Sequence, residues 1–395
     1  MKDFLKLLLY RGGAAIGTLL FTLYVYMFSS VEEASVIFSF VLLIYLLSML
    51  SRIGLDIYIV KDASRMTQRE GGRLFSKIIT FICVFNFIIS FALFFYYKKT
   101  DNSQEFLYLS LSMIPFSIWM PISCYFRTQG ENFYSAIFEP GTIFLITTFF
   151  AYLLNELPML DVFVCVNWFL FLIVFLYLIA NGYYTFSFNC LHGWIELVKS
   201  GYGYMTLSII SYLTLWLPAF FIKSISPDYF VDYNLAVRLI APFTFIITTV
   251  DFYLSTRFSR NYFESKYEEI LKDITIFRKF FSIIGGLYLI LTSSVLFIAE
   301  KYVHITSTVF EVYTIVLVGY IISSAIGPYG TLLNMANRVK YVNYGTAFAL
   351  LVLVFFIYPV NVVFGMNGIV ILISLSIVIR SLLIRYYSNS LNVLG

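Results

Sequence analysis

Uninterrupted apolar runs of roughly 20 residues recur along the whole chain, and this is the length that an α-helix needs to cross the hydrocarbon core of a bilayer. Residues 78–97, for instance, contain no Asp, Glu, Lys or Arg. Inside lipid every backbone polar group needs a partner within the protein, which restricts spanning segments to helices and closed barrels. Barrel strands alternate in polarity, whereas these runs are apolar on every face. The sequence therefore predicts an all-α polytopic membrane protein.

The composition excludes a soluble protein. Hydrophobic residues make up 60% of the chain and charged residues only 12%, whereas soluble domains carry roughly 25% charged residues. Since each apolar run provides one crossing of about 20 residues, about twelve transmembrane helices are predicted. They are expected at residues 11–29, 34–60, 78–97, 106–126, 133–154, 162–181, 201–222, 231–256, 280–299, 309–333, 341–360 and 367–387.

The positions of the basic residues predict the orientation in the membrane. Most of the 26 Lys and Arg residues fall in connections on one side of the membrane, together with both termini. Cationic connections are retained in the cytoplasm. We therefore expect a multi-pass protein of the inner (plasma) membrane with both termini cytoplasmic.

The longest basic connections, residues 61–77 and 257–279, follow the second and the eighth predicted spans. The charge pattern thus repeats after six helices, which indicates two six-helix lobes, residues 1–185 and 186–395. Parallel repeats of this kind are a recurrent transporter plan, with the substrate path between the repeats. Residues 264–280 carry apolar side chains at helical spacing and predict a short amphipathic surface helix.

Charged residues inside the spans are the candidate functional residues, because an ionisable group at the bilayer centre costs at least about 2.5 kcal/mol. Arg52 and Asp56 lie four residues apart in the second span, so they share one helix face and can form an ion pair. An arginine that faces a water-filled cavity would bind phosphate or carboxylate bidentately. The alternative is that Arg52 only neutralises Asp56.

The eighth span supplies a second set of charges. Arg238 is flanked at a distance by Asp232 and Asp251, and Arg257 stands at the predicted inner end of the span. Arg11 opens the first span. If the lobes meet as in other repeat transporters, the first, second, seventh and eighth helices line a cationic cavity suited to an anionic cargo. Alternatively, Arg11 and Arg257 extend to lipid headgroups at the membrane surface.

No enzymatic constellation is present in the sequence. Phosphate-binding loops, H-E-x-x-H and G-x-S-x-G are all missing, and the chain has two histidines. We expect no catalytic residues, no metal, no cofactor and no nucleic-acid partner.

Three stretches stand out by their order and spacing along the chain, namely RIGLDIYIVK at residues 52–61, YFVDYNLAVRLI at residues 229–240 and SAIGPYGTLLNMANRVK at residues 324–340. They resemble the Wzx-type O-antigen and polysaccharide flippases of the multidrug/oligosaccharidyl-lipid/polysaccharide (MOP) exporter superfamily. Residues 52–61 (RIGLDIYIVK) are similar to the end of that family's second span. Residues 229–240 (YFVDYNLAVRLI) are similar to the start of its eighth span, and residues 324–340 (SAIGPYGTLLNMANRVK) to the end of its tenth. The order and spacing of these stretches carry the resemblance, which extends over essentially the whole chain.

The resemblance implies a MATE-like fold of two lobes with a cationic lumen, in which Arg52 and Arg238 match cavity arginines and Asp56 and Asp251 tune them. It implies a flippase that moves an undecaprenyl-pyrophosphate-linked oligosaccharide, an O-antigen or capsular repeat unit, to the periplasmic leaflet by alternating access. An ion gradient or the membrane potential would drive it. The implied partners are this lipid-linked oligosaccharide, membrane lipids, and the polymerase and chain-length regulator of the same pathway.

Two other functions stay open at this point. A polysaccharide polymerase or ligase of the same pathway also has many helices, but it usually needs a long extracytoplasmic loop, and the predicted outside loops are short. A multidrug exporter of the same superfamily would favour acidic cavity residues for organic cations, whereas the candidates here are mostly basic.

Overall fold

A computed structural model describes residues 2–63, 66–99, 104–154, 156–185, 193–303, 306–336 and 338–389 of the chain. The chain divides into two compact units, an N-terminal unit, Lys2–Ile209, and a C-terminal unit, Ile210–Gly395. The division falls inside one helix, α10 (Trp194–Ile225). The helix α10 therefore belongs in part to each unit.

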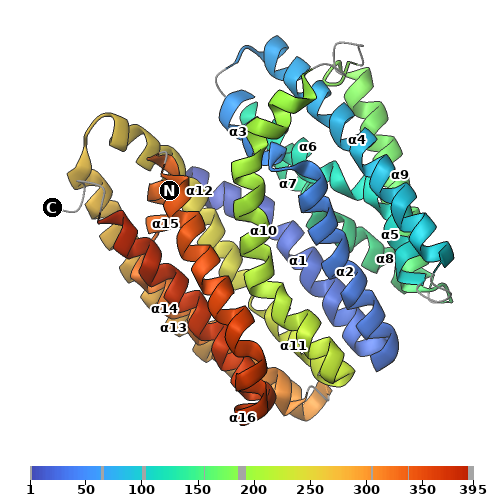
Figure 1. Ribbon diagram of the computed structural model, residues 1–395, viewed down its shortest axis with the longest axis vertical. Helices are drawn as coiled ribbons and strands as arrows, with labels where there is room; N and C mark the ends of the chain where they lie inside the picture. The colour runs from blue at the N-terminus through green and yellow to red at the C-terminus, as the bar shows by residue number, and fades with distance from the viewer. Residues whose placement is uncertain are drawn as a thin grey trace. The chain divides into compact units, whose positions relative to one another are not determined.

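The N-terminal unit is built from helices only in its described residues. The first helix, α1, packs along α8, and α5 packs against α2, α4 and α9 (Figure 1). The short helices α3 and α6 pack against each other. The helices are α1 (Lys2–Phe28), α2 (Val31–Arg52), α3 (Leu55–Ala63), α4 (Gln68–Lys99), α5 (Gln104–Ser117), α6 (Trp119–Thr128), α7 (Asn132–Ile137), α8 (Pro140–Leu153) and α9 (Met159–Ala180).

The C-terminal unit repeats this plan with the remainder of α10 and six further helices. Here α14 packs against α11, α13 and α16, and α12 packs against α13 and α15. The helices are α11 (Pro227–Leu239), α12 (Ala241–Phe263), α13 (Tyr267–Val303), α14 (Ser307–Ile326), α15 (Tyr329–Met335) and α16 (Val339–Ser388). The last of these contains a residue with non-helical backbone, Gly365, at which two helices join.

The described helices are those of a multi-pass membrane protein. Eight are long and apolar enough to cross a membrane, or nine if α11 and α12 form one bent span. Two shorter apolar helices, Gly12–Phe28 and Pro140–Leu153, add to these, and α16 has 50 residues, enough for two crossings of about 20 residues each. The all-α membrane fold is thus confirmed, and the number of twelve spans is compatible with the structure.

Four spans that the sequence predicted as continuous are broken, so those predictions were wrong at the break. The second is interrupted at Ile53 and Gly54, the fifth at Phe138 and Glu139, the eighth at Ile240 and the tenth at Gly327. Ile53, Gly54 and Gly327 have positive φ, which an α-helix does not accommodate. The second span of each unit is thus interrupted, whereas α5 and α6 join through helical backbone at Ile118 as one apolar helix of 25 residues. The helix α3 packs on α6, and α12 packs on α15.

The break in the second span fits against α10. A Cβ atom added to Gly54, whose φ is +71°, would lie 2.5 Å from the backbone nitrogen of Met205, and one added to Gly201 would overlap the carbonyl oxygen of Ile53. Both positions therefore require glycine, since the two backbones approach too closely for any side chain. This contact holds the α2–α3 break against the N-terminal part of α10.

The structure also corrects the prediction of a separate surface helix at residues 264–280. The structure has one helix of 37 residues, α13, that starts at Tyr267 and continues through the ninth predicted span. The short connection before it contains Glu264, which accepts a hydrogen bond from Arg260 and pairs with Lys266. These two cations hold the pKa of Glu264 below its usual value. The polar segment therefore forms the first turns of the spanning helix, with no break that would let it lie separately on the membrane surface.

Candidate functional site

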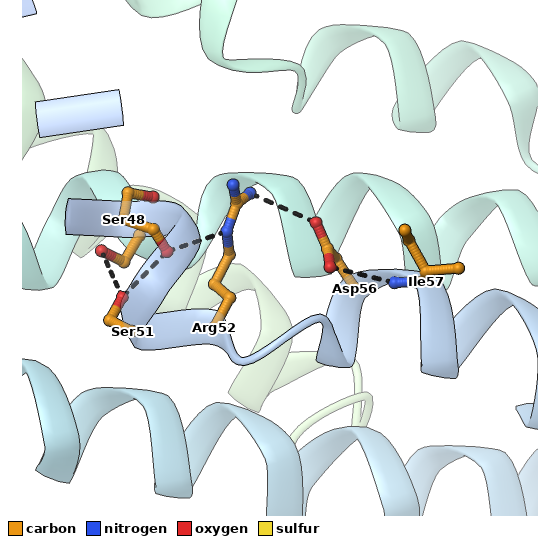
Figure 2. A network of polar contacts seen from close by, with 6 residues as sticks. Ser48, Ser51, Arg52, Asp56 and Ile57 are labelled. Carbon is orange, nitrogen blue, oxygen red and sulfur yellow. Dashed lines mark hydrogen bonds and ion pairs between the residues drawn. The ribbon is translucent and has the colours of Figure 1, made fainter. Parts of the chain in front are cut away.

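Arg52 is the last residue of α2, and its side chain is buried, with 6% of the residue exposed. Its Nε donates a hydrogen bond to the carbonyl oxygen of Ser48 at 3.1 Å (Figure 2). The nearest carboxylate oxygen, Oδ2 of Asp56, lies 3.6 Å from Nη1. The ion pair that the four-residue spacing predicted therefore forms. It is longer than the 2.7–2.9 Å typical of a charge-assisted hydrogen bond.

The break in the helix explains why these two charges are tolerated inside a span. Arg52 occupies the last turn of α2, and Asp56 occupies the first turn of α3. A helix C-terminus favours a cation and a helix N-terminus an anion, because the peptide dipoles leave partial charges at the ends. The carboxylate also accepts a hydrogen bond from the backbone N–H of Ile57 at 3.0 Å. Each charge thus lies at the helix end that stabilises it.

Arg238 occupies the equivalent place in the C-terminal unit, in the last turn of α11 just before the break at Ile240. Its guanidinium lies 5.1 Å from the ring centroid of Trp216 on α10, a cation–π contact. The Trp216 ring lies in turn beside that of Tyr212, with 6.2 Å between the ring centroids. Within the described part of the chain, no carboxylate comes within ion-pair distance of Arg238.

The two aspartates that flank Arg238 in sequence have other partners. Asp232 accepts a hydrogen bond from the hydroxyl of Thr306 at 2.7 Å, and Asp251 accepts one from Thr331 of α15 at 2.8 Å. Asp251 also interacts electrostatically with Arg380 of α16. The acid in the eighth span therefore stabilises the packing of α12 against the short helix α15 that follows the break in the tenth span.

Arg257 and Arg11 are not brought together with Arg238. The Nε of Arg257 lies 3.0 Å from Oδ2 of Asp273 on α13, and its Nη1 donates to the hydroxyl of Tyr253 at 3.2 Å. This pair links α12 to α13. The side chain of Arg11 lies outside the described residues. A role in cargo binding stays a prediction for all six candidate residues.

The sequence did not single out a second buried ion pair in the N-terminal unit. Nη2 of Arg127, in the last turn of α6, lies 3.9 Å from Oε1 of Glu139, which immediately precedes α8. This second pair links the end of α6 to the start of α8. The Glu-Pro step at residues 139–140, which is typical of a helix start, was the available signal.

Comparison with known proteins places this geometry in a known fold. The structure of the lipid II flippase MurJ in an inward closed conformation aligns with a TM-score of 0.74 and 12% identity, covering 98% of this chain and 87% of that one. A Vibrio cholerae MATE transporter aligns at 0.67 and 13%, covering 100% and 99%. The chain has the fold of the MOP superfamily transporters. A MOP superfamily transporter from Pyrococcus furiosus aligns at 0.65 and 13%, covering 98% and 94%.

No family model and no curated protein matches the sequence. The likeness to these structures is therefore one of fold. Two of these three similar proteins are transporters, and the third is a lipid II flippase.

Proposed function

We propose that this protein is a flippase that moves a lipid-linked oligosaccharide with a pyrophosphate linkage, an O-antigen or capsular repeat unit, from the cytoplasmic to the periplasmic leaflet by alternating access. In this proposal the protein makes and breaks no covalent bond. An ion gradient or the membrane potential supplies the free energy. The polymerase and chain-length regulator of the same pathway are proposed as partners in the inner membrane.

The position of Arg238 is the observation that carries the proposal. A guanidinium stays charged at physiological pH, and a charge inside a span is costly unless an opposite charge or water compensates it. No described carboxylate lies within ion-pair distance of Arg238, and its guanidinium group lies over the Trp216 ring. The N–H donors around the edge of the group suit an anionic cargo, because phosphate oxygens accept such donors bidentately.

Arg52 supports the same cargo in the N-terminal unit. Its side chain makes one described hydrogen bond, to a backbone carbonyl, and its ion pair with Asp56 is long. A phosphate that displaces the Asp56 carboxylate would gain hydrogen bonds that this ion pair lacks. Asp56 and Asp251 are proposed to tune the two arginines rather than to bind cargo.

Multidrug export is the second candidate function, because MATE transporters share the fold. Such a protein would use an uncompensated acid to bind an organic cation. Asp251, the acid in the eighth span, accepts a hydrogen bond from Thr331 and interacts with Arg380. Asp251 is thus already held by a hydrogen bond across the fold, whereas the described neighbour of the Arg238 guanidinium is an aromatic ring, which favours the anionic cargo. A drug-sensitivity panel on a deletion strain separates the two functions.

The proposed function is tested by the leaflet in which the lipid-linked repeat unit lies. A strain lacking both this protein and the polymerase accumulates single units, which a membrane-impermeant lectin or antibody detects on spheroplasts. We expect the units to be inaccessible until this gene is restored. If the units are exposed without the gene, translocation is not its function, and the polymerase or ligase alternative moves to first place.

A further inference from the structure

The last two helices of the C-terminal unit, α15 and α16, carry positive charge and no negative charge. No Asp or Glu follows residue 311 in the sequence. Four basic residues do follow it, namely Arg338, Lys340, Arg380 and Arg385. A carboxylate that balances these charges must therefore come from another element of the fold. Among the described residues, no carboxylate forms an ion pair with any of the four.

Two arginines lie beside Tyr329, the first residue of α15, at the break in the tenth span. Arg278 of α13 donates a hydrogen bond from Nε to the carbonyl oxygen of Ala325 at 3.0 Å. Its Cδ lies 3.2 Å from the point that a Cβ atom on Gly327 would occupy, and Cε2 of the Tyr329 ring lies 3.1 Å from the same point. The guanidinium carbon of Arg385 lies 5.9 Å from the centroid of this ring. We call Arg278, Tyr329 and Arg385 the Tyr329 site.

Both guanidinium groups of the Tyr329 site keep donors that the described fold does not use. A guanidinium group has five N–H donors. The structure describes one hydrogen bond for Arg278, and a cation–π contact without a hydrogen bond for Arg385. Asp251, which contacts α15 through Thr331, interacts with a different arginine, Arg380. The site therefore carries two positive charges, and the described carboxylates form no ion pair with either.

The surface of α16 that leads to Arg385 is apolar and open. Ile371, Leu375 and Leu382 are 48%, 52% and 50% exposed. Their spacing of four and seven residues places them on one face of the helix, and Arg385 follows within one turn of Leu382. We call these three residues the α16 stripe. An apolar stripe that ends at a cation matches a phospholipid, which has acyl chains next to a negatively charged phosphate.

The purely structural explanation is that each arginine only stabilises the fold. Arg278 contacts a carbonyl oxygen in the last turn of α14, where the helix dipole favours a cation. A long basic side chain such as that of Arg385 can also extend to lipid headgroups of any kind. This explanation predicts no preference among lipids, and it predicts that lipid binding does not depend on the half-buried Arg278.

We propose that the Tyr329 site binds the phosphate of an anionic phospholipid, with an acyl chain along the α16 stripe. The phosphate oxygens accept hydrogen bonds from Arg278 and Arg385, because guanidinium groups present their donors in a planar fork. The distribution of basic residues predicts that this end of the unit is cytoplasmic, and basic pockets between helices on that side suit anionic headgroups. The bound lipid links α13, α15 and α16 at the break. This inference goes beyond the proposed function and does not depend on the cargo.

The inference is tested by lipid binding to the purified full-length protein in detergent, with dissociation constants from native mass spectrometry. The probes are phosphatidylglycerol and phosphatidylcholine with the same acyl chains. The wild-type protein should bind phosphatidylglycerol at least about tenfold more tightly, the factor that corresponds to one charge-assisted hydrogen bond. Arg278→Gln and Arg385→Gln should each remove this preference and leave phosphatidylcholine binding unchanged. Arg385→Lys, which keeps the charge without the fork, should retain part of it.

Arg385→Gln is the decisive variant, because Arg385 is exposed and its replacement leaves no buried partner without a hydrogen bond. If Arg278→Gln does not fold, because it loses the hydrogen bond to Ala325, Arg385→Gln still decides the question. Arg260→Gln is the charge control. It changes an exposed arginine that is paired with Glu264, and it should leave the preference for phosphatidylglycerol intact.

Three results would overturn the inference. They are equal affinities of the wild-type protein for the two phospholipids, an unchanged preference in Arg385→Gln, and an equal loss in Arg260→Gln. Undecaprenyl pyrophosphate distinguishes the two sources of lipid phosphate, phospholipid and cargo. It should displace phosphatidylglycerol no better than an equal amount of unlabelled phosphatidylglycerol does. Displacement at a tenfold lower concentration would assign the site to the cargo lipid and contradict the proposal of a phospholipid.

Discussion

The second and the eighth spans each place an arginine next to a break, but the arginine has a different partner in each span. Each is broken, and each has an arginine in the last turn before the break, Arg52 in α2 and Arg238 in α11. The second span resumes with an acid, Asp56, in the first turn of α3 and pairs it with Arg52. The eighth span resumes in α12 with no acid in its first turn, and Arg238 lies instead over the Trp216 ring.

This difference indicates a division of roles between the two spans. A carboxylate neutralises a guanidinium, and the pair can then remain buried. An aromatic ring attracts the cation without neutralising it, so the positive charge persists. Arg52 is therefore expected to matter for stability as well as for cargo, and Arg238 mainly for cargo.

The largest effect on folding is expected at the α2–α3 break, where two backbones are in close contact. Gly201→Ala should prevent folding, because the new Cβ would overlap the carbonyl oxygen of Ile53 in the α2–α3 break. The measurement is the yield of monodisperse protein in fluorescence-detected size-exclusion chromatography. Gly203→Ala, two residues away on α10 with open space around its Cβ, is the matched control. Equal yields from the two variants would show that the close contact does not hold the break.

A smaller effect is expected from removing one member of the buried pair. Arg52→Gln leaves Asp56 uncompensated and should lower the free energy of unfolding by about 3 to 5 kcal/mol, as for other buried ion pairs. The double variant Arg52→Gln/Asp56→Asn should recover most of this loss. Arg238→Gln removes a charge that no described carboxylate neutralises and should change the free energy by under about 1 kcal/mol. Thermal unfolding in detergent measures all three, and similar losses at Arg52 and Arg238 would remove the distinction between the spans.

The smallest effect concerns the ring under Arg238. A double-mutant cycle with Trp216→Leu and Arg238→Gln should give a coupling free energy of about 0.5 to 1 kcal/mol, the size of a partly exposed cation–π contact. Trp216→Phe keeps an aromatic face and should retain part of this coupling. Denaturant unfolding of the single and double variants measures it. Additive single-variant effects would mean that the ring does not position the guanidinium.

Much of the fold follows from hydrophobicity, and much of the site does not. Apolar runs predicted the all-α membrane fold because lipid leaves the backbone no alternative partner. The breaks were missed because they depend on backbone dihedrals and on glycine contacts between distant segments, such as Gly54 with α10. Local signals existed, since Gly54 stands between Arg52 and Asp56, and a glycine inside a helical pattern weakens the prediction of a continuous helix.

For the candidate site, only contacts between near neighbours in sequence were predictable. The pair of Arg52 and Asp56 was found from its four-residue spacing. Contacts across the fold, Trp216 with Arg238 and Thr331 with Asp251, join residues 22 and 80 positions apart, and composition contains no signal for them. Arg127 and Glu139 were overlooked because charges near the predicted ends of spans are expected to be solvated rather than paired between two helices.

Flipping by purified protein in liposomes tests the central claim most directly, that Arg238 carries a positive charge needed for an anionic cargo. The cargo is a fluorescent undecaprenyl-pyrophosphate-linked sugar, and an impermeant quencher reports its leaflet. Arg238→Gln should abolish flipping, Arg238→Lys should retain part of it, and Arg257→Gln, at an arginine already paired with Asp273, should flip at a substantial rate. Flipping by Arg238→Gln at the wild-type rate, with equal amounts of folded protein, would contradict the account.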